Sequence, residues 1–374
     1  MLHKAIRYRL YPTKEQEVWL AKTFGCCRKI WNLMLSDKIE SYQKTKSFGK
    51  QTPAQYKKEY PYLKEVDSLA LANVQLDLQQ AMKNCFEGTK FFGFPKYKSA
   101  KDNQNSYTTN NQKGSISLEK KGIRLPKIGK VKAKIHRVPP EDWRLKAATI
   151  TKERDGTYYV SVLFAYERNV EKVAKESESA VGLDYKSNGL YMDSNGRIGE
   201  HPKYYRESQE RLAKAQRKLK QKKVGSNNYK KTQQRVAKIH RHIANQRKDS
   251  LQKKSTEIAN RYDIVCVESL HMRAMANQGF GNGKATLDNG YGMFLSMLEY
   301  KLAEQGKYLV KVSKWYPSSQ LCHVCGRKKK LRLEERIYEC ECGLVMDRDY
   351  NAAMNILREG LRVLREEVVE REIR

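Results

Sequence analysis

The sequence lacks any run of about 18 apolar residues, the length that a helix needs to cross a membrane. Its amino terminus also lacks the apolar core of a signal peptide. These two absences argue against membrane-spanning and secreted proteins, so we expect a soluble, cytoplasmic protein with no membrane partner. The sequence has neither a His-hydrophobe-His signature nor a tyrosine-nucleophile signature. Their absence argues weakly against a strand-transfer enzyme.

Acidic residues are scarce relative to basic ones. Asp and Glu number 42 against 74 Lys and Arg, which gives a net charge of +32 over 374 residues. A surplus of this size and sign is typical of a protein that binds a large polyanion. The bias is strongest in residues 203–254, where 18 basic residues stand against three acidic ones. Because a solvated helix face needs no such bias in sign, we expect this stretch to contact nucleic acid.

Cysteine is also infrequent, with eight residues in the chain, and half of them occupy one short stretch. Two close pairs, each followed by a glycine, make up this group: Cys322 with Cys325, and Cys340 with Cys342. Two such pairs separated by a loop supply the four thiolates of a tetrahedral zinc site. The alternative, four unrelated buried thiols, does not explain the clustering. The remaining cysteines lie in apolar patterns and are expected to be reduced and buried: Cys26, Cys27, Cys85 and Cys266.

The amino-terminal part of the chain predicts one strand followed by helices. Residues 3–11 alternate in polarity, as a half-buried strand does. Thr13 then starts a capping box, and we expect the helix that follows to stop near Gly25. A second helix is expected through residues 30–39 and a third over residues 68–86.

Aromatic residues and lysines alternate in residues 90–98, which are expected to form a loop. Such a loop either lays rings and charges along a nucleic-acid backbone or is pinned to the core by its phenylalanines; the sequence leaves both open. Five short β patterns follow and predict a small β-barrel that the strand at residues 3–11 could complete. These patterns are Ile116–Leu118, Ile123–Leu125, Val131–Ile135, Ala148–Lys152 and Tyr158–Phe164.

In the carboxyl-terminal part, two buried strands end in an acidic residue. They are residues 180–184, ending at Asp184, and residues 264–268, ending at Glu268. A hairpin after the first strand is typical of the start of a ribonuclease-H-like sheet. Between the two strands the basic residues form two helices that break at residues 225–227.

Further elements are expected towards the carboxyl terminus. Residues 279–283 are expected to be mobile because they are rich in glycine. A helix is expected from about Asn289 to Gly306, then a strand over residues 308–312, and later a helix over residues 351–357.

Three acids, Asp184, Glu268 and Asp349, each terminate or open an apolar element. Hydrolysis of a phosphodiester commonly uses two divalent ions, and Mg²⁺ prefers carboxylate oxygens. Acids at strand ends along one sheet edge converge in space. We therefore predict that these three side chains together bind two Mg²⁺ ions. Asp347 competes with Asp349 for the third place. The alternative for each acid is a cap at a strand end or a surface charge.

These residues together resemble the split RuvC nuclease of the TnpB (OrfB) family, transposon-encoded proteins similar to the type V CRISPR effectors. The resemblance lies in Gly182-Leu183-Asp184, in Val265-Cys266-Val267-Glu268-Ser269-Leu270, and in Asp347-Arg348-Asp349-Tyr350-Asn351-Ala352-Ala353. The cysteine pairs lie between the second and third segments. Residues 94–98 and 315–320 also resemble family segments, so the resemblance covers nearly the whole chain. One departure is Tyr185-Lys186-Ser187 after Asp184, where many relatives have Leu-Gly or Tyr-Gly.

The resemblance implies an RNA-guided DNA endonuclease. It implies a guide RNA from the transposon end, a double-stranded DNA target with a short adjacent motif, and cutting at a RuvC site. Asp184, Glu268 and Asp349 are implied as the catalytic acids, with Mg²⁺ at the acids and structural Zn²⁺ at the cysteines. It also implies a prokaryotic, nucleoid-associated protein. The sequence indicates no particular protein partner.

The implied fold is a multi-domain α+β and α/β protein with four parts: a β-barrel wedge domain, a helical recognition insert, a split RuvC (ribonuclease-H-like) nuclease domain and a zinc ribbon insert. The expected boundaries are residues 1–12 for the first wedge strand, 13–90 for the recognition module, 91–168 for the wedge barrel, 169–179 for a linker, 180–314 for the nuclease domain with basic helices at 203–260, 315–345 for the zinc ribbon, which would bind target nucleic acid, and 346–374 for the third acid and a final helix.

Two other functions are compatible with the same resemblance. Some relatives have lost the acids and act as RNA-guided repressors, and a transposase accessory factor is a further alternative. The presence of all three acids in this chain argues against the repressor.

Overall fold

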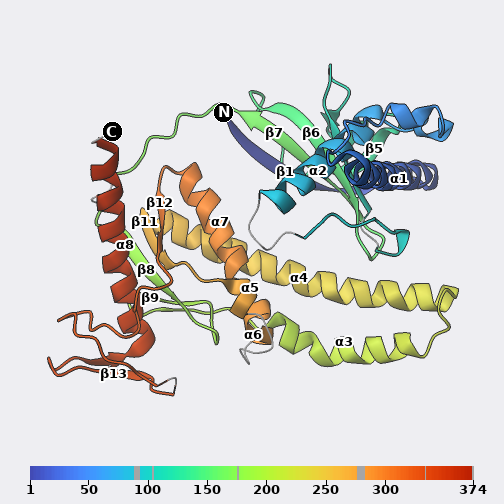
Figure 1. The fold of residues 1–374 in the computed structure, drawn as a ribbon. Helices are drawn as coiled ribbons and strands as arrows, with labels where there is room; N and C mark the ends of the chain where they lie inside the picture. The colour runs from blue at the N-terminus through green and yellow to red at the C-terminus, as the bar shows by residue number, and fades with distance from the viewer. Residues whose placement is uncertain (88–92, 103–104, 175–176, 276–282, 333, 373–374) are drawn as a thin grey trace. The chain divides into compact units, whose positions relative to one another are not determined.

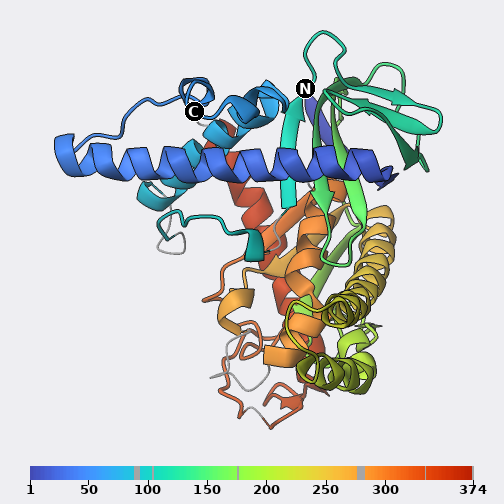
Figure 2. The same cartoon turned by 90° about the vertical axis from the view of Figure 1, so that its right-hand side faces the viewer.

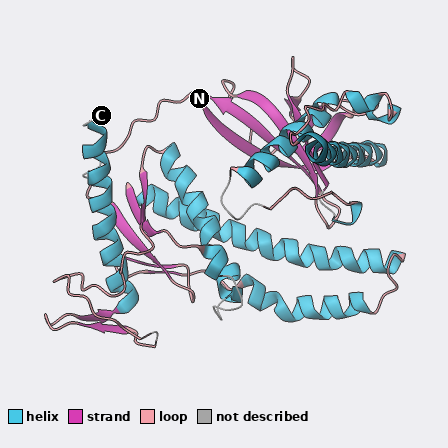
Figure 3. Ribbon diagram, viewed as in Figure 1, coloured by secondary structure: helices cyan, strands magenta, loops and turns pink. Residues whose placement is uncertain are grey.

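The computed structural model describes residues 1–374 except 88–92, 103–104, 175–176, 276–282, 333 and 373–374. The chain divides into two compact units, residues 1–168 and 169–374, and each is described by itself. Elements of both units are labelled in Figure 1, and Figure 3 colours them as helix or strand. None of the helices in the described ranges combines the length and apolar character needed to span a membrane.

A seven-stranded antiparallel sheet forms the centre of the first unit. Its order is β2-β6-β7-β1-β5-β4-β3. The bounds are β1 Leu2–Tyr11, β2 Asn105–Asn110, β3 Ser117–Glu119, β4 Gly122–Leu125, β5 Gly129–Lys134, β6 Arg144–Lys152 and β7 Tyr158–Tyr166. Strand β1 pairs with β7 along nearly its whole length, from Leu2 opposite Tyr166 to Leu10 opposite Tyr158. The predicted strands at residues 3–11 and in the five short patterns are therefore confirmed.

The expected small β-barrel is confirmed only in part: the predicted strands form one sheet, but its order is linear, with β2 and β3 at the two ends among the described strands. Helices cover the sheet instead of further strands: α1 (Lys14–Thr45) and α2 (Ser68–Phe86) share one hydrophobic core with it. Phe24 of α1, for example, meets Tyr107 of β2 edge-on, with ring centroids 5.7 Å apart. Three short 3-10 helices complete this unit: Gln55–Lys57, Pro61–Lys64 and Ala100–Asp102.

Helix α1 begins as predicted but does not stop at Gly25. Thr13 forms the capping box with Gln16, and the helix then continues for 32 residues to Thr45; Figure 2 shows its full length. A glycine inside a helix costs only about 1 kcal/mol relative to alanine. Leu20, Phe24, Cys27, Ile30, Trp31 and Met34 form a buried series through Gly25. Burial of this series outweighs the cost of the glycine.

The segment before the short strands was only partly predicted. Of the aromatic and lysine loop, residues 90–92 lie outside the described residues, and residues 93–99 have no regular structure. Trp31 donates from Nε1 to the Lys96 carbonyl at 3.0 Å, and Lys98 lies over the Trp31 ring. The loop is thus held on α1. Residues 106–108 are part of β2, a strand that the sequence did not predict.

The second unit contains a five-stranded mixed sheet in the order β10-β9-β8-β11-β12. Strands β8 (Ala180–Tyr185), β11 (Ile264–Glu268) and β12 (Tyr308–Val312) are parallel. Strand β9 (Tyr191–Asp193) pairs antiparallel with β8, and β10 (Ile198–Gly199) pairs antiparallel with β9. Gly196, with φ of +76°, supports the predicted hairpin turn between β9 and β10. All five strands agree with the predicted patterns.

Helices cover both faces of this sheet. Val181 and Leu183 of β8 and Val265 and Val267 of β11 pack in one core with α4 (Asn227–Arg261) and α7 (Tyr291–Glu304). Ile264 and Cys266 of β11 pack on the opposite side with α8 (Arg348–Glu372). Two short helices, α5 (Met272–Met275) and α6 (Gly283–Asn289), precede α7. The glycine segment predicted to be mobile lies, up to residue 282, outside the described residues.

The basic residues form the predicted pair of helices, α3 (Tyr204–Lys220) and α4. Leu212 and Ala215 of α3 pack against Ile239 and Ile243 of α4. Figure 1 shows the two helices side by side. The pair is therefore a packed element with its charges on the outside.

Candidate active site and cysteine cluster

The alternation of β8 and β11 places Asp184 and Glu268 on one face of the sheet. Since Val181 and Leu183 face α4 and α7, Gly182 and Asp184 face α8. The same parity puts Glu268 on the side of Cys266, which packs against α8. The two strands are parallel neighbours in register, with Leu183 opposite Val267. Asp184, the penultimate residue of β8, and Glu268, the last residue of β11, therefore lie at the same edge and on the same face of the sheet.

Helix α8 comes unusually close to this face because two glycines leave room for it. A Cβ at Gly182 would overlap the Ala353 carbonyl and lie 2.7 Å from the Leu357 nitrogen. On the helix side, a Cβ at Gly360 would overlap the Cys266 side chain. The amino-terminal end of α8, which carries Asp349, is held close to the strand ends for this reason.

Asp347 and Asp349 have different roles in the structure. Asp347 Oδ1 accepts hydrogen bonds from the backbone N–H of Asp349 at 2.8 Å and of Tyr350 at 3.0 Å. It therefore caps the amino-terminal end of α8, which leaves Asp349 as the candidate for the third acid. The expected helix at 351–357 is longer than predicted and includes Arg348.

Charge coupling links the three acids. Burial, together with the negative charges of Asp349 and Glu268, raises the pKa of Asp184 well above its usual value. Burial raises the pKa of Glu268 to about 7. Among the described residues, the group of three or more side chains placed to hold one metal ion directly is the set of four cysteines.

The donor set of this edge fits a hard divalent cation. It consists of carboxylates, whose oxygens are the usual ligands of Mg²⁺. Burial makes their charged forms costly without a nearby cation, which is the situation that a bound cation relieves. Lys186, two residues beyond Asp184, forms an ion pair with Asp349, and about 20% of each side chain is exposed.

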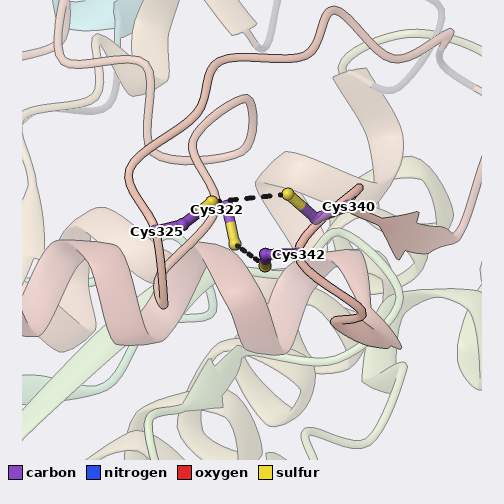
Figure 4. A group of neighbouring side chains, drawn as sticks. All are labelled: Cys322, Cys325, Cys340 and Cys342. Atoms are coloured by element: carbon purple, nitrogen blue, oxygen red, sulfur yellow. Dashed lines mark hydrogen bonds between the residues drawn. The ribbon is translucent and has the colours of Figure 1, made fainter.

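The four cysteines form a compact cluster, drawn in Figure 4. Cys322 and Cys342 have Sγ atoms 3.6 Å apart, and those of Cys325 and Cys340 are 3.5 Å apart. These separations exclude disulfides, whose S–S distance is about 2 Å. They approach the roughly 3.8 Å edge of a tetrahedron with Zn–S bonds of about 2.3 Å. The predicted cluster is confirmed and is compatible with a structural zinc ion.

Two buried asparagines of α8 fasten the first cysteine pair to the acidic helix. Asn351 Nδ2 donates to the Leu321 carbonyl at 2.6 Å, and its Oδ1 accepts from the backbone N–H of His323 at 3.0 Å. Asn355 Nδ2 donates to the carbonyls of Ser318 at 2.8 Å and Leu321 at 2.7 Å. The cysteine cluster therefore helps to fix the helix that carries Asp349.

The two-stranded sheet of the cluster, β13 (Ile337–Glu339) and β14 (Val345–Asp347), leads directly into α8. Tyr338 of β13 is fully buried, and its hydroxyl donates to the carbonyls of Gln320 at 3.0 Å and Arg327 at 3.2 Å. A small core thus holds the two cysteine loops together.

Basic side chains line an open pocket between α3 and α4. The pocket is bounded by Arg211, Arg235, Lys238, Ile239, Arg241, His242 and Asn245. Its position on the helical pair agrees with the charge bias of the sequence. A concave surface of this charge can hold phosphate groups.

From the sequence, no role was assigned to Lys186, Asn351 or Asn355. Two asparagines four residues apart lie on one helix face, and this spacing beside the acidic turn was a usable signal. The pairing of Lys186 with Asp349 had no such signal in the sequence, because the two residues are 163 positions apart.

Three family models match the chain. One described as "Probable transposase" (OrfB of IS605) matches residues 163–278, and one described as a Cas12f1-like TNB domain matches residues 291–356. A third, described as a helix-turn-helix domain of OrfB, matches residues 1–47. In this chain that last segment contains β1 and the single helix α1.

Curated relatives match over almost the whole chain. A protein of Streptomyces pristinaespiralis named "Putative RNA-guided DNA endonuclease" is 36% identical, covering 96% of this chain and 89% of the relative. A protein of Escherichia coli K12 named "Putative RNA-guided DNA endonuclease InsQ" is 29% identical, covering 96% and 93%. TnpB-like proteins of a mimivirus are 33% identical over 124 residues, or 32% of this chain.

Among solved structures, a similar chain occurs in the cryo-EM structure of a Cas12f1-sgRNA-target DNA complex. The TM-score is 0.58 at 12% sequence identity, covering 95% of this chain and 98% of the other. At that identity, the likeness concerns the fold.

Proposed function

Because this chain belongs to the TnpB (OrfB) family, we propose that it is an RNA-guided DNA endonuclease. The observation that carries the proposal is the placement of Asp184 and Glu268 at one edge of parallel strands, where the charge of Asp349 also acts on Asp184. Carboxylates that gather at one edge of a sheet, two of them acting on the charge of the third, supply the ligands that metal-dependent phosphodiester hydrolysis needs.

In this proposal Asp184, Glu268 and Asp349 hold the divalent ions of a RuvC-type site. Mg²⁺ bound there would stabilise the charge that develops on the phosphate and lower the pKa of the attacking water. The protein's own contribution is positional: two strands and the capped end of α8 present the carboxylates from fixed backbone. Cys322, Cys325, Cys340 and Cys342 would hold a structural Zn²⁺ that keeps the amino-terminal end of α8 in place.

The partners follow from the charge and from the family. A guide RNA from the transposon end would pair with one strand of the target DNA, while the protein holds the backbones and reads a short adjacent motif. The α3–α4 pair, with the pocket lined by Arg235 and Lys238, is suited to backbone contact because its charge is basic and its core is packed.

We further propose the following domain roles. Residues 13–90 form the recognition module, residues 1–12 and 91–168 form the wedge, residues 169–179 link it to the nuclease, and residues 180–314 with 346–374 form the nuclease around a zinc ribbon at 315–345. The order β10-β9-β8-β11-β12 supports a ribonuclease-H-like sheet in the nuclease.

Two experiments test the proposal. The protein is first purified from cells that also carry its flanking transposon end, and the co-purifying RNA is sequenced. We expect one defined RNA, and only random cellular RNA would contradict the guided mechanism. That complex is then incubated with matching DNA and Mg²⁺. We expect wild type to cut and Asp184→Asn to bind the DNA without cutting; equal cutting by both would remove Asp184 from the site.

A further inference from the structure

Lys186 and Arg348 are two cations whose charges act on Asp184, and among the described residues Lys186 is the one that also forms an ion pair with Asp349. Its ammonium group pairs with Asp349 Oδ2, and its positive charge also acts on Asp184. About 21% of the Lys186 side chain and 19% of the Asp349 side chain are exposed. By contrast, Lys311 and Glu299 form an ion pair whose side chains are 48% and 59% exposed. Water therefore screens the Lys186 pair much less than such a surface pair.

The backbone of Lys186 is fixed, so its position is not that of a freely moving surface lysine. Its N–H donates to the Leu190 carbonyl at 3.3 Å, and its carbonyl accepts from the Gly189 N–H at 3.2 Å. Asn289, a buried residue of α6, donates from Nδ2 to the same carbonyl at 3.0 Å. These contacts hold the base of the side chain just beyond the strand end that carries Asp184.

An ammonium ion and a divalent ion make opposing demands on Asp349. The Asp349 oxygen that accepts the hydrogen bond from Lys186 is one of the two oxygens that this carboxylate can offer as a metal ligand. Two positive centres close to the same oxygen would repel each other. A divalent ion that takes this oxygen of Asp349 therefore has to displace the Lys186 ammonium group.

Resting on the proposed function, we propose that Lys186 is a built-in counter-cation of the acidic centre. It pairs with Asp349 while no divalent ion is bound, and it competes with the ion for that carboxylate. Lys186 is thus a positioning residue that raises the divalent-ion concentration at which the centre fills. It also limits the mutual repulsion of Asp184, Glu268 and Asp349 in the metal-free protein.

The test measures the affinity for Mn²⁺ by isothermal titration calorimetry. It uses the full-length protein, with its zinc retained and free of nucleic acid. We expect Lys186→Gln to bind Mn²⁺ at least about tenfold more tightly than wild type, because binding no longer breaks a charge-assisted hydrogen bond. Lys186→Arg, which keeps the charge, is expected to stay near wild type. Lys311→Gln is the matched control, since it removes an exposed lysine pair, and we expect it to leave the affinity unchanged.

Thermal unfolding gives a second measurement. Without added divalent ion, Lys186→Gln is expected to melt below wild type, because the acids have lost their counter-charge. Added Mn²⁺ should raise its melting temperature more than that of wild type and close the gap. A gap that stays constant at every Mn²⁺ concentration would contradict the competition.

Asp184→Asn separates the two proposals. If Asp184→Asn weakens Mn²⁺ binding while Lys186→Gln binds as wild type does, the metal centre stands and the role of Lys186 is refuted. Weaker binding by Lys186→Gln refutes it as well, since the lysine would then assist the ion. If Asp184→Asn binds Mn²⁺ as wild type does, the metal centre is misplaced and both proposals fail.

Discussion

At the scale of single residues, the surroundings of each acid or thiol determine its chemistry. Glu268 ends a strand whose other members are all buried, and that burial raises its pKa to about 7. Asp347, two residues from Asp349, instead accepts backbone hydrogen bonds at the start of α8. Residues of one chemical type thus divide into metal-binding candidates and helix caps according to what lies around them.

The raised pKa of Glu268 predicts a pH-dependent stability. The folded protein binds the proton of the Glu268 carboxyl group more tightly than the unfolded chain does, because the pKa of this group in the unfolded chain is near 4.5. Stabilisation from Glu268 is therefore complete below about pH 4.5 and is lost as the pH rises through about 7. We expect urea unfolding without added divalent ions to show a smaller decline from pH 5 to pH 8 for Glu268→Gln than for wild type. Parallel declines would show that Glu268 does not titrate in this way.

The cysteine cluster predicts one zinc ion per chain. Cys340→Ser replaces a thiolate by a hydroxyl, a poor zinc ligand at neutral pH, so we expect the purified variant to lose most of its zinc. Elemental analysis of the purified protein measures the number of zinc ions per chain. Cys85→Ser, which alters a thiol outside the cluster, is the control and should retain the metal. Equal zinc in both variants would contradict the assignment.

At the scale of elements, the approach of α8 to β8 and β11 is what brings a helix-borne acid to two strand-borne acids. Gly182 and Gly360 permit this approach because neither carries a Cβ in the contact. The buried asparagines Asn351 and Asn355 then connect α8 to the cysteine loops. Displacement of α8 would therefore disturb the acidic edge and the cysteine cluster together.

Gly182→Ala tests this packing. Its Cβ would overlap backbone atoms of α8, so the helix has to shift, and overpacking of this kind costs typically about 1–3 kcal/mol. We expect a loss of that size in the free energy of unfolding, measured by urea denaturation. Gly25→Ala is the matched control: a Cβ there meets no atom within 4 Å, and the site is inside α1. It should gain about 0.5–1 kcal/mol. An unchanged free energy of unfolding for Gly182→Ala would show that α8 tolerates displacement.

At the scale of the whole molecule, a charge of +32 on 374 residues makes electrostatics a large part of nucleic-acid affinity. Packing of α3 on α4 gathers part of this charge around one pocket. Contacts of this kind hold phosphates in any sequence, so they suit a protein in which an RNA supplies the sequence information.

The salt dependence of binding measures these contacts. We expect each of Arg235→Gln and Lys238→Gln to weaken binding to double-stranded nucleic acid and to reduce the slope of log affinity against log salt by about 0.9. Fluorescence anisotropy over a salt series gives the slope. Lys253→Gln is the control on the same helix, because Lys253 already pairs with Asp249 at 2.6 Å. An unchanged slope for both pocket variants would place the nucleic acid elsewhere.

Local patterns determined much of this protein. Short apolar runs that stop at an acidic residue predicted the strands that carry Asp184 and Glu268, because a strand covered on both faces is apolar along most of its length. The spacing of the cysteines predicted their cluster, because closely spaced ligands come from one short turn. The Thr13 capping box also lies within a few residues and was readable for the same reason.

Features that depend on contacts between residues far apart in the sequence were decided only by the tertiary structure. Gly25 stays helical because burial along α1 outweighs a local preference, and the sheet of the first unit shares its core with α1 and α2. Lys186 meets Asp349 across 163 residues of chain. A residue's own neighbours in sequence say nothing about such a contact, because it is set by the packing of α8 on the strands. The sequence thus named the acids, and the fold determined which cation stands among them.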